Sequence, residues 1–194
     1  MPRALTEQEK CRICQKVLEK GKAVVMSQGM RKTSVDDIAR AAGIAKGSFY
    51  QHFETKEKFM YELVWHVHRQ LFEQAEQMLL RGDDIQKNAR TLLTHLFNMS
   101  EMTFFIRNSQ EITELFVSMS NQELQAGKQM EKLMFEKLLD MAEVNTEKVK
   151  PGVVHNYIHS MYLTMGSDLM IKDALSETFD QMMNSLISYI FGDI

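Results

Sequence analysis

The stretch that most constrains the fold of this chain is residues 29–57, where two short amphipathic segments flank a glycine. Ser34 is a good helix N-cap, and Asp37 follows three positions later, in a spacing like that of a capping box. Apolar residues then recur on one helical face, at Val35, Ile38, Ala39 and Ala42. Gly43 follows, and glycine most easily takes the left-handed conformation that ends a helix. The pattern predicts a helix that ends in a tight turn at Gly43.

A second short helix is predicted directly after this turn, from about Ala45 to His52. Phe49 and Phe53 lie four positions apart, so we expect both rings to point to the same side, into a small core. Five polar residues then face outward: Lys46, Ser48, Tyr50, Gln51 and His52. Two helices joined by a glycine turn are typical of a helix-turn-helix, in which the second helix enters the major groove of DNA.

The outward side of this motif has the chemistry of a DNA contact surface. Lysine can neutralise phosphates, tyrosine and histidine can donate hydrogen bonds to them, and glutamine and serine can reach base edges. Gly47 removes a side chain where the backbone would press against a duplex. The alternative is that these residues simply form a solvated polar face. That interpretation is reasonable for any one of them but not for all of them together. The predicted DNA-binding residues are Thr33, Ser34, Ala45, Lys46, Gly47, Ser48, Tyr50, Gln51, His52 and Lys56.

The motif also has a relative among known families. The run Thr-Ser-x-x-x-Ile-Ala-x-x-Ala-Gly-x-x-x-Gly-x-x-Tyr-x-His-Phe-x-x-Lys-Glu resembles the signature of TetR-type transcriptional repressors, and the likeness covers Gly29–Glu57. The resemblance implies a homodimer on a near-palindromic DNA operator and a small effector in the C-terminal domain that releases the DNA. One departure is Ala45, where such proteins often have Ser or Thr. It would remove an N-cap and one phosphate contact.

Charge is distributed unevenly along the chain, although the net charge is only −3. Residues 1–60 carry 12 Lys and Arg against 7 Asp and Glu, whereas residues 61–194 carry 11 against 19. A basic first part (+5) and an acidic second part (−8) suit a DNA-binding head on a separate body. We therefore expect an all-α chain of two domains, with the helix-turn-helix in residues 1–54 and a helical ligand-binding and dimerisation domain in 55–194.

Helical periodicity runs through nearly all of the chain, whose only prolines are Pro2 and Pro151. One helix is predicted from Thr6 to Gln28, and a long one from Lys56 to Leu80, ending at Gly82. The long helix begins beside the second helix of the motif and ends in the second domain, so it is a natural lever between them. The other helices are expected at about 84–98, 101–108, 110–119, 121–143, 150–171 and 176–191.

The second domain is rich in methionine and phenylalanine, and the whole chain has 16 methionines. Flexible, polarizable side chains can line an apolar pocket for a hydrophobic effector, although residue by residue the pattern favours simple core filling. The candidate ligand-binding residues are Met99, Met102, Phe105, Phe116, Met119, Met134, Tyr162 and Met165.

The last two predicted helices carry wide apolar faces. In TetR-type proteins the equivalent pair packs against its twin as a four-helix bundle, which holds two DNA-binding heads at a fixed separation. The resemblance therefore implies dimer-interface residues at Val153, Tyr157, Met161, Phe179, Met183, Leu186 and Ile190.

Other classes of function find little support. Cys11 and Cys14 lack the βαβ context of a redox motif and the further ligands of a zinc site, so structural cysteines are favoured. His155 and His159 lie four apart without the glutamate of a protease motif, so exposed or interfacial histidines are favoured. No catalytic residue, metal or cofactor is expected. A DNA-binding protein that needs no ligand is the remaining alternative.

The start of the chain is polar and charged, and no apolar run of about 18 residues occurs. These features predict a cytoplasmic protein without a membrane span.

Overall fold

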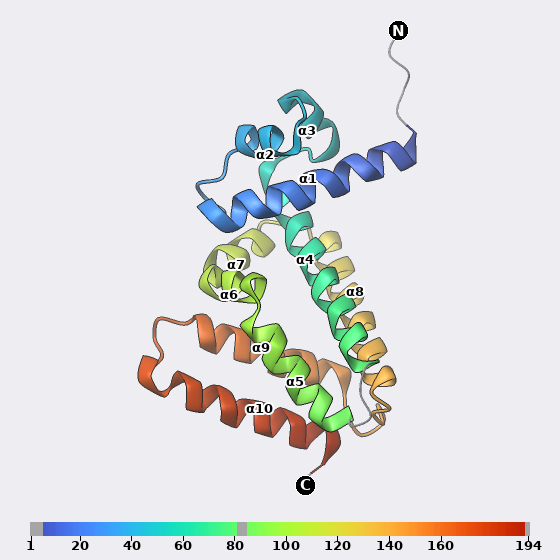
Figure 1. Cartoon of the computed structure of the whole chain (residues 1–194), viewed down its shortest axis with the longest axis vertical. Coiled ribbons are helices and arrows are strands. Elements are labelled where there is room, and N and C mark those ends of the chain that lie inside the picture. Colours follow the sequence, from blue (N-terminus) through green and yellow to red (C-terminus); the bar gives the residue numbers. More distant parts are fainter. Residues whose placement is uncertain (1–5, 81–84, 193–194) are drawn as a thin grey trace. The chain divides into compact units, whose positions relative to one another are not determined.

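The computed structural model describes residues 6–80 and 85–192, and within these ranges it contains helices and no strand (Figure 1). The expected all-α fold is confirmed. The described elements are α1 (Glu7–Gln28), α2 (Val35–Ala42), α3 (Lys46–His52), α4 (Lys56–Leu79), α5 (Ile85–Asn98), α6 (Ser100–Arg107), α7 (Ser109–Val117), α8 (Asn121–Met141), α9 (Pro151–Gly166), the short 3₁₀ helix η1 (Lys172–Ala174) and α10 (Leu175–Phe191).

Most helices begin and end within a few residues of the predicted positions. α1 begins with a capping box, in which Thr6 Oγ1 accepts from the Glu9 backbone N–H and the Glu9 carboxylate accepts from that of Thr6. α9 differs, because it ends at Gly166 rather than at residue 171. A Cβ on Gly166 would lie 2.4 Å from the carbonyl oxygen of Ile106, so α9 ends where it approaches α6 closely. The predicted helix end at Gly82 lies outside the described residues.

The chain divides into two compact units. Unit 1 comprises the residues up to His68 together with Thr113–Val117, and unit 2 comprises Arg69–Ile112 and the residues from Ser118 onward. The division falls inside α4 and inside α7, whereas the predicted domain boundary follows residue 54. The helix-turn-helix therefore shares its compact unit with the first half of α4, because that half packs against the same core.

Unit 1 is built on an aromatic cluster of Phe49, Phe53 and Phe59, whose ring centroids lie 5.2 to 5.5 Å apart. Phe49 and Phe59 are fully buried. Gly21 lets α1 approach this cluster, since a Cβ there would lie 2.4 Å from the Phe59 ring and 3.2 Å from Ile38. The position of the helix-turn-helix is therefore fixed by direct packing of α1 on the aromatic core.

The core of unit 2 contains three of the predicted dimer-interface residues. Met161, Met183 and Leu186 are 0, 1 and 0% exposed and belong to one hydrophobic cluster. For these three the prediction is corrected, because they pack inside their own chain and offer no surface to a partner. An apolar helix face in the sequence does not distinguish packing in the core of one chain from packing against a second chain. Val153 is exposed, and Tyr157, Phe179 and Ile190 are half-buried.

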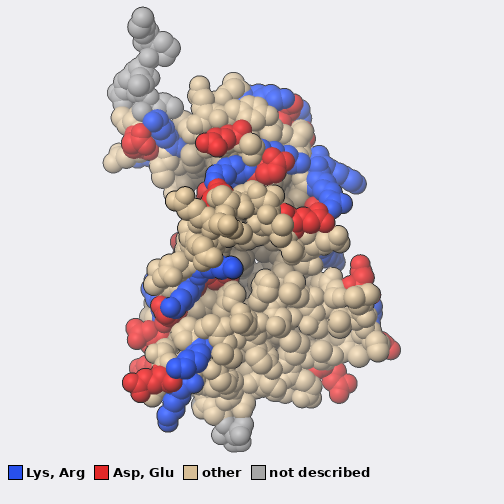
Figure 2. All heavy atoms as spheres, turned by 180° about the vertical axis from the view of Figure 1, so that it is seen from behind, with Lys and Arg blue, Asp and Glu red and all other residues tan. Residues whose placement is uncertain are grey.

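The two units differ in surface charge. In the view of Figure 2, basic and acidic side chains intermix on unit 1, whereas a wide area of unit 2 shows no charged side chain. α9 has no Asp, Glu, Lys or Arg over its length. None of the described helices is long and apolar enough to cross a bilayer.

Candidate nucleic-acid interface

The first helix of the motif, α2, has the predicted ends. Ser34 Oγ accepts from the Asp37 N–H at 3.2 Å, and the Asp37 carboxylate accepts from the Ser34 N–H at 3.1 Å and from its hydroxyl at 2.6 Å. These bonds from Ser34 lower the pKa of the Asp37 carboxyl. Gly43 closes the helix in the left-handed conformation, with φ of 67°. The turn between the two helices is therefore determined locally, as the spacing of these residues predicts.

The second helix, α3, is anchored by one buried ring. Phe49 is fully buried, and its ring centroid lies 5.4 Å from that of Phe53. At the start of α3 the N-cap residue Ala45 makes no side-chain hydrogen bond, so the predicted loss of an N-cap is confirmed. Anchoring from one side leaves the opposite side of α3 to solvent.

The solvent side of α3 carries most of the predicted contact residues. Lys46, Gly47, Tyr50 and Gln51 are exposed, and Ser48 is half-buried. A Cβ built on Gly47 meets no atom within 4 Å outside its chain neighbours and its own helix backbone. Glycine inside a helix costs about 1 kcal/mol relative to alanine, so nothing in the folded chain explains the absence of a side chain at this position.

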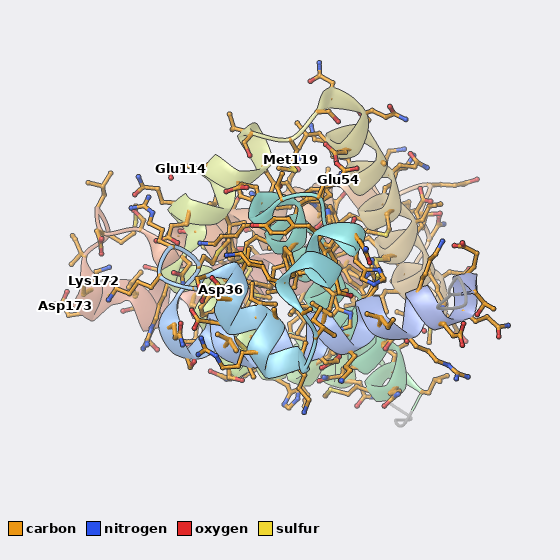
Figure 3. The ribbon with its side chains drawn as sticks, turned by 90° about the horizontal axis from the view of Figure 1, so that it is seen from above. Asp36, Glu54, Glu114, Met119, Lys172 and Asp173 are labelled. Atoms are coloured by element: carbon orange, nitrogen blue, oxygen red, sulfur yellow. The ribbon has the colours of Figure 1, made fainter. Side chains whose placement is uncertain are left out.

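Lys46 already has a partner. Its Nζ donates to Asp36 of α2 at 2.8 Å, and both side chains are about half exposed; Asp36 is labelled in Figure 3. The hydrogen bond to Asp36 raises the pKa of the Lys46 ammonium. Residue spacing does not predict this acidic partner, because a contact between different helices follows no single helical spacing. The pair is exposed, so a phosphate can compete for the ammonium group at little cost.

Two residues predicted to contact phosphates donate hydrogen bonds within the protein instead. Thr33 is fully buried, and its hydroxyl donates to the Gly29 carbonyl at 2.8 Å, so the predicted side-chain contact to DNA is corrected. Ser34 is exposed, but its hydroxyl and N–H both donate to Asp37. The donors of both residues are therefore used within the protein, by Thr33 in the turn that precedes α2 and by Ser34 in the first turn of the helix.

The last two predicted residues lie at the edge of the motif. His52 is half-buried, and its Nδ1 lies 3.5 Å from Sγ of Cys14 in α1, so the ring faces the protein rather than outward as predicted. Lys56 Nζ donates to the Arg31 carbonyl at 3.0 Å and is half-buried. Arg31 in turn pairs with Glu114 of α7 at 3.0 Å within unit 1. Sequence reasoning did not find this last pair, since it joins residues far apart in the chain.

The candidate ligand residues are not all brought together. Within unit 2, Tyr162 donates its hydroxyl to the Phe105 carbonyl at 2.7 Å, and burial raises the pKa of the phenol. Phe116 instead belongs to unit 1, where its ring centroid lies 5.4 Å from that of Tyr61 and 5.9 Å from that of Trp65. The others are half-buried in unit 2: Met99, Met102, Met119, Met134 and Met165.

The two histidines of α9 form part of a stacked row of rings. His155 pairs with Glu131 of α8 at 3.0 Å, which raises the pKa of the imidazole. Its ring stacks at 5.9 Å on His159, whose own pKa is lowered by burial and by His155. The described residues contain no group of three or more His, Cys, Asp or Glu side chains that could hold a metal ion.

The exposed second helix, the left-handed glycine turn and the buried aromatic anchor together define a helix-turn-helix of the DNA-binding class. Residues 17–63 match the family model of bacterial regulatory proteins of the tetR family. The chain therefore carries the helix-turn-helix domain of the TetR family, and the resemblance noted in the sequence is confirmed.

Curated relatives match over part of the chain. The HTH-type transcriptional repressor DhaR of Mycobacterium sp. (strain GP1) is 49% identical over 45 residues, which is 23% of this chain and 23% of that protein. The matches span less than half the length of the curated relatives.

Solved structures match over nearly the whole chain. A TetR-family transcriptional regulator from Pectobacterium atrosepticum has a TM-score of 0.65 and 15% identity, with 94% of each chain covered. The transcriptional regulator FadR from Bacillus subtilis, in complex with stearoyl-CoA, has a TM-score of 0.52 and 16% identity, covering 93% of this chain and 99% of that one. At these identities the likeness concerns the fold.

Proposed function

We propose that this protein is a transcriptional repressor that binds a palindromic DNA operator as a homodimer and is released by a small hydrophobic effector. The observation that carries the DNA-binding part is the solvent side of α3, where Lys46, Gly47, Tyr50 and Gln51 are exposed around a position without a side chain. In the major groove, a position without a side chain lets the backbone of such a helix approach the duplex more closely. The names of the matched relatives support the same role.

In this proposal the contacts divide by chemistry. Lys46 and Lys56 neutralise phosphates and Tyr50 donates to one, whereas Gln51 and Ser48 read base edges. Lys46 exchanges Asp36 for a phosphate oxygen. Asp36 therefore lowers the affinity for DNA in general, because its charge repels the backbone and competes for the ammonium group.

The homodimer rests on two helices of unit 2. A palindromic site requires two heads at a fixed separation, about one helical turn of DNA (roughly 34–36 Å) or a multiple of it. α9 has no Asp, Glu, Lys or Arg, and Val153 on it is exposed. Together with the half-buried Tyr157, Phe179 and Ile190, this surface is suited to burial against a second copy.

The effector is proposed for unit 2, where half-buried methionines accompany Phe105 and Tyr162. The stearoyl-CoA complex of a protein with the same fold supports an apolar ligand. Because α4 continues from unit 1 into unit 2, it is the proposed lever. An effector releases DNA only to the extent that it binds the DNA-free conformation more tightly than the DNA-bound one.

The test is selection of random duplexes with the purified full chain at two salt concentrations. An enriched inverted repeat that survives added salt supports the proposal, whereas weak, salt-sensitive binding without a consensus contradicts it. Lys46→Gln should then weaken binding to all duplexes and lower the salt slope by about 1. The matched control is Lys172→Gln in unit 2, which removes a similar exposed pair with Asp168 and should leave binding unchanged; Lys172 is labelled in Figure 3.

A further inference from the structure

Two free thiols of α1 lie beside the end of α3. Cys14 Sγ is 3.5 Å from Nδ1 of His52, the last residue of α3, although the two residues are 38 positions apart in the chain. Cys11, three positions before Cys14, is exposed, and Cys14 is half-buried. Exposure of Cys11 does not suit the structural role that the sequence favoured, because an exposed thiol fills no core.

The histidine depends on this sulfur for its orientation. His52 Nε2 is buried and has no hydrogen-bond partner among the described residues, so the ring makes its polar contact through Nδ1 to Cys14. A change at Cys14 therefore alters the side chain that ends α3. This arrangement links the chemistry of a thiol on α1 to the helix that we propose reads DNA.

We propose that Cys11 and Cys14 are a thiol pair that a hydroperoxide oxidises to a disulfide, which withdraws Cys14 from His52. Residues three apart on an α-helix have Cα atoms about 5 Å apart, from the helix rise and radius. Disulfides span Cα separations of about 4.4–6.8 Å, so the bond can form without moving α1 as a whole. The Cβ atoms of such a pair lie about 5–6 Å apart on a regular helix, whereas a disulfide needs about 3.5–4.5 Å. The backbone of this turn of α1 must therefore adjust as the two side chains turn toward each other.

The exposure of the two thiols determines which of them reacts first. The Cys11 thiolate attacks one oxygen of the hydroperoxide; an S–O bond forms, which gives a sulfenic acid on Cys11, and the O–O bond breaks. The alkoxide or hydroxide that leaves takes up the proton that the Cys11 thiol lost on ionising, and becomes an alcohol or water. Cys14 then attacks the Cys11 sulfur, an S–S bond forms, and hydroxide leaves and takes up the Cys14 proton as water. Burial, and then the neighbouring Cys11 and Glu62, raise the pKa of Cys14, which suits it to the second step rather than the first. His52 Nδ1 is placed to relay that proton.

The chemical test uses the reduced full chain, hydrogen peroxide, N-ethylmaleimide labelling and intact mass spectrometry. The expected result is a monomer that loses two hydrogen atoms and both labelable thiols, and that regains them with dithiothreitol. Cys14→Ser should instead accumulate a sulfenic acid on Cys11 that dimedone traps, and Cys11→Ser should retain its thiol. A disulfide-linked dimer, or equal thiol loss in wild type and both variants, would overturn the proposal.

Coupling to α3 has a readout that needs no DNA. The ring resonances of His52 should shift on oxidation of the wild type and stay unchanged in Cys11→Ser, because only a disulfide moves Cys14. Unchanged His52 resonances in a fully oxidised wild type would overturn the coupling.

The consequence for DNA rests on the proposed function. Oxidation should weaken binding to the duplex recovered by selection in the wild type but not in Cys11→Ser, and equal affinity before and after oxidation would overturn this consequence. If the reduced protein selects no duplex, the proposed function fails, while the mass and resonance results still decide the thiol pair.

Discussion

Replacing Gly21 by alanine tests how α1 is held on the helix-turn-helix. The new Cβ would lie 2.4 Å from the terminal carbon of the Phe59 ring, a distance that requires something to move. The ring has little room to move, because Phe59 is fully buried. Its ring centroid lies 5.5 Å from that of Phe49 and 5.2 Å from that of Phe53. Overpacking of this kind costs about 1–3 kcal/mol.

The helix itself gains from the same substitution. Alanine is better than glycine in a helix interior by about 1 kcal/mol, so the expected net effect of Gly21→Ala is a loss of up to about 2 kcal/mol of unfolding free energy. With a urea slope of about 1–3 kcal/mol per molar, the unfolding midpoint should fall by up to about 2 M. Trp65 is the only tryptophan and is 4% exposed in unit 1, so its fluorescence reports this unit.

Gly47→Ala is the matched control, since it adds the same methyl group to a helix where no atom lies within 4 Å. It should raise the midpoint by the equivalent of up to about 1 kcal/mol. A midpoint raised by Gly21→Ala as much as by Gly47→Ala would refute the predicted clash, because the Phe59 ring would then move aside without cost. Under the proposed function, Gly47→Ala should also weaken DNA binding, whereas Gly152→Ala, equally uncrowded in unit 2, should not.

Three further predictions concern single contacts. Ala45→Ser should supply the missing cap of α3 and add about 1 kcal/mol, measured by urea unfolding, and no gain would show that α3 needs no cap. The pKa of Asp37 is lowered in the folded state, so this carboxylate contributes stability above its unfolded pKa, and that stability is lost as pH falls through the folded pKa. Asp37→Asn should therefore make the free energy of unfolding less dependent on pH in the acid range. An unchanged pH dependence would contradict this. The raised pKa of His155 contributes stability that is present below its unfolded pKa and is lost as pH rises through the folded pKa. Glu131→Gln should remove that dependence, and NMR titration of His155 should show a lower pKa in the variant.

Much of the interface could be predicted because it depends on neighbours in the chain. The capping box of Ser34 and Asp37, the turn at Gly43 and the uncapped start of α3 at Ala45 each involve residues within a few positions. Such contacts follow from helix geometry alone, so residue spacing is sufficient to find them. The exposed position of Gly47 also follows from the inward direction of Phe49, two residues further along α3.

The amino-acid sequence by itself determined the helices, their caps, the helix-turn-helix and its family, because these depend on local spacing and residue type. Only the tertiary structure decided where each polar or apolar side chain is used. Thr33 is buried and donates to the Gly29 carbonyl, Met161 lies in the core, and His52 faces Cys14. Helical periodicity says that a face is apolar or polar, but not which distant segment covers it, since that is set by packing between residues far apart in the chain.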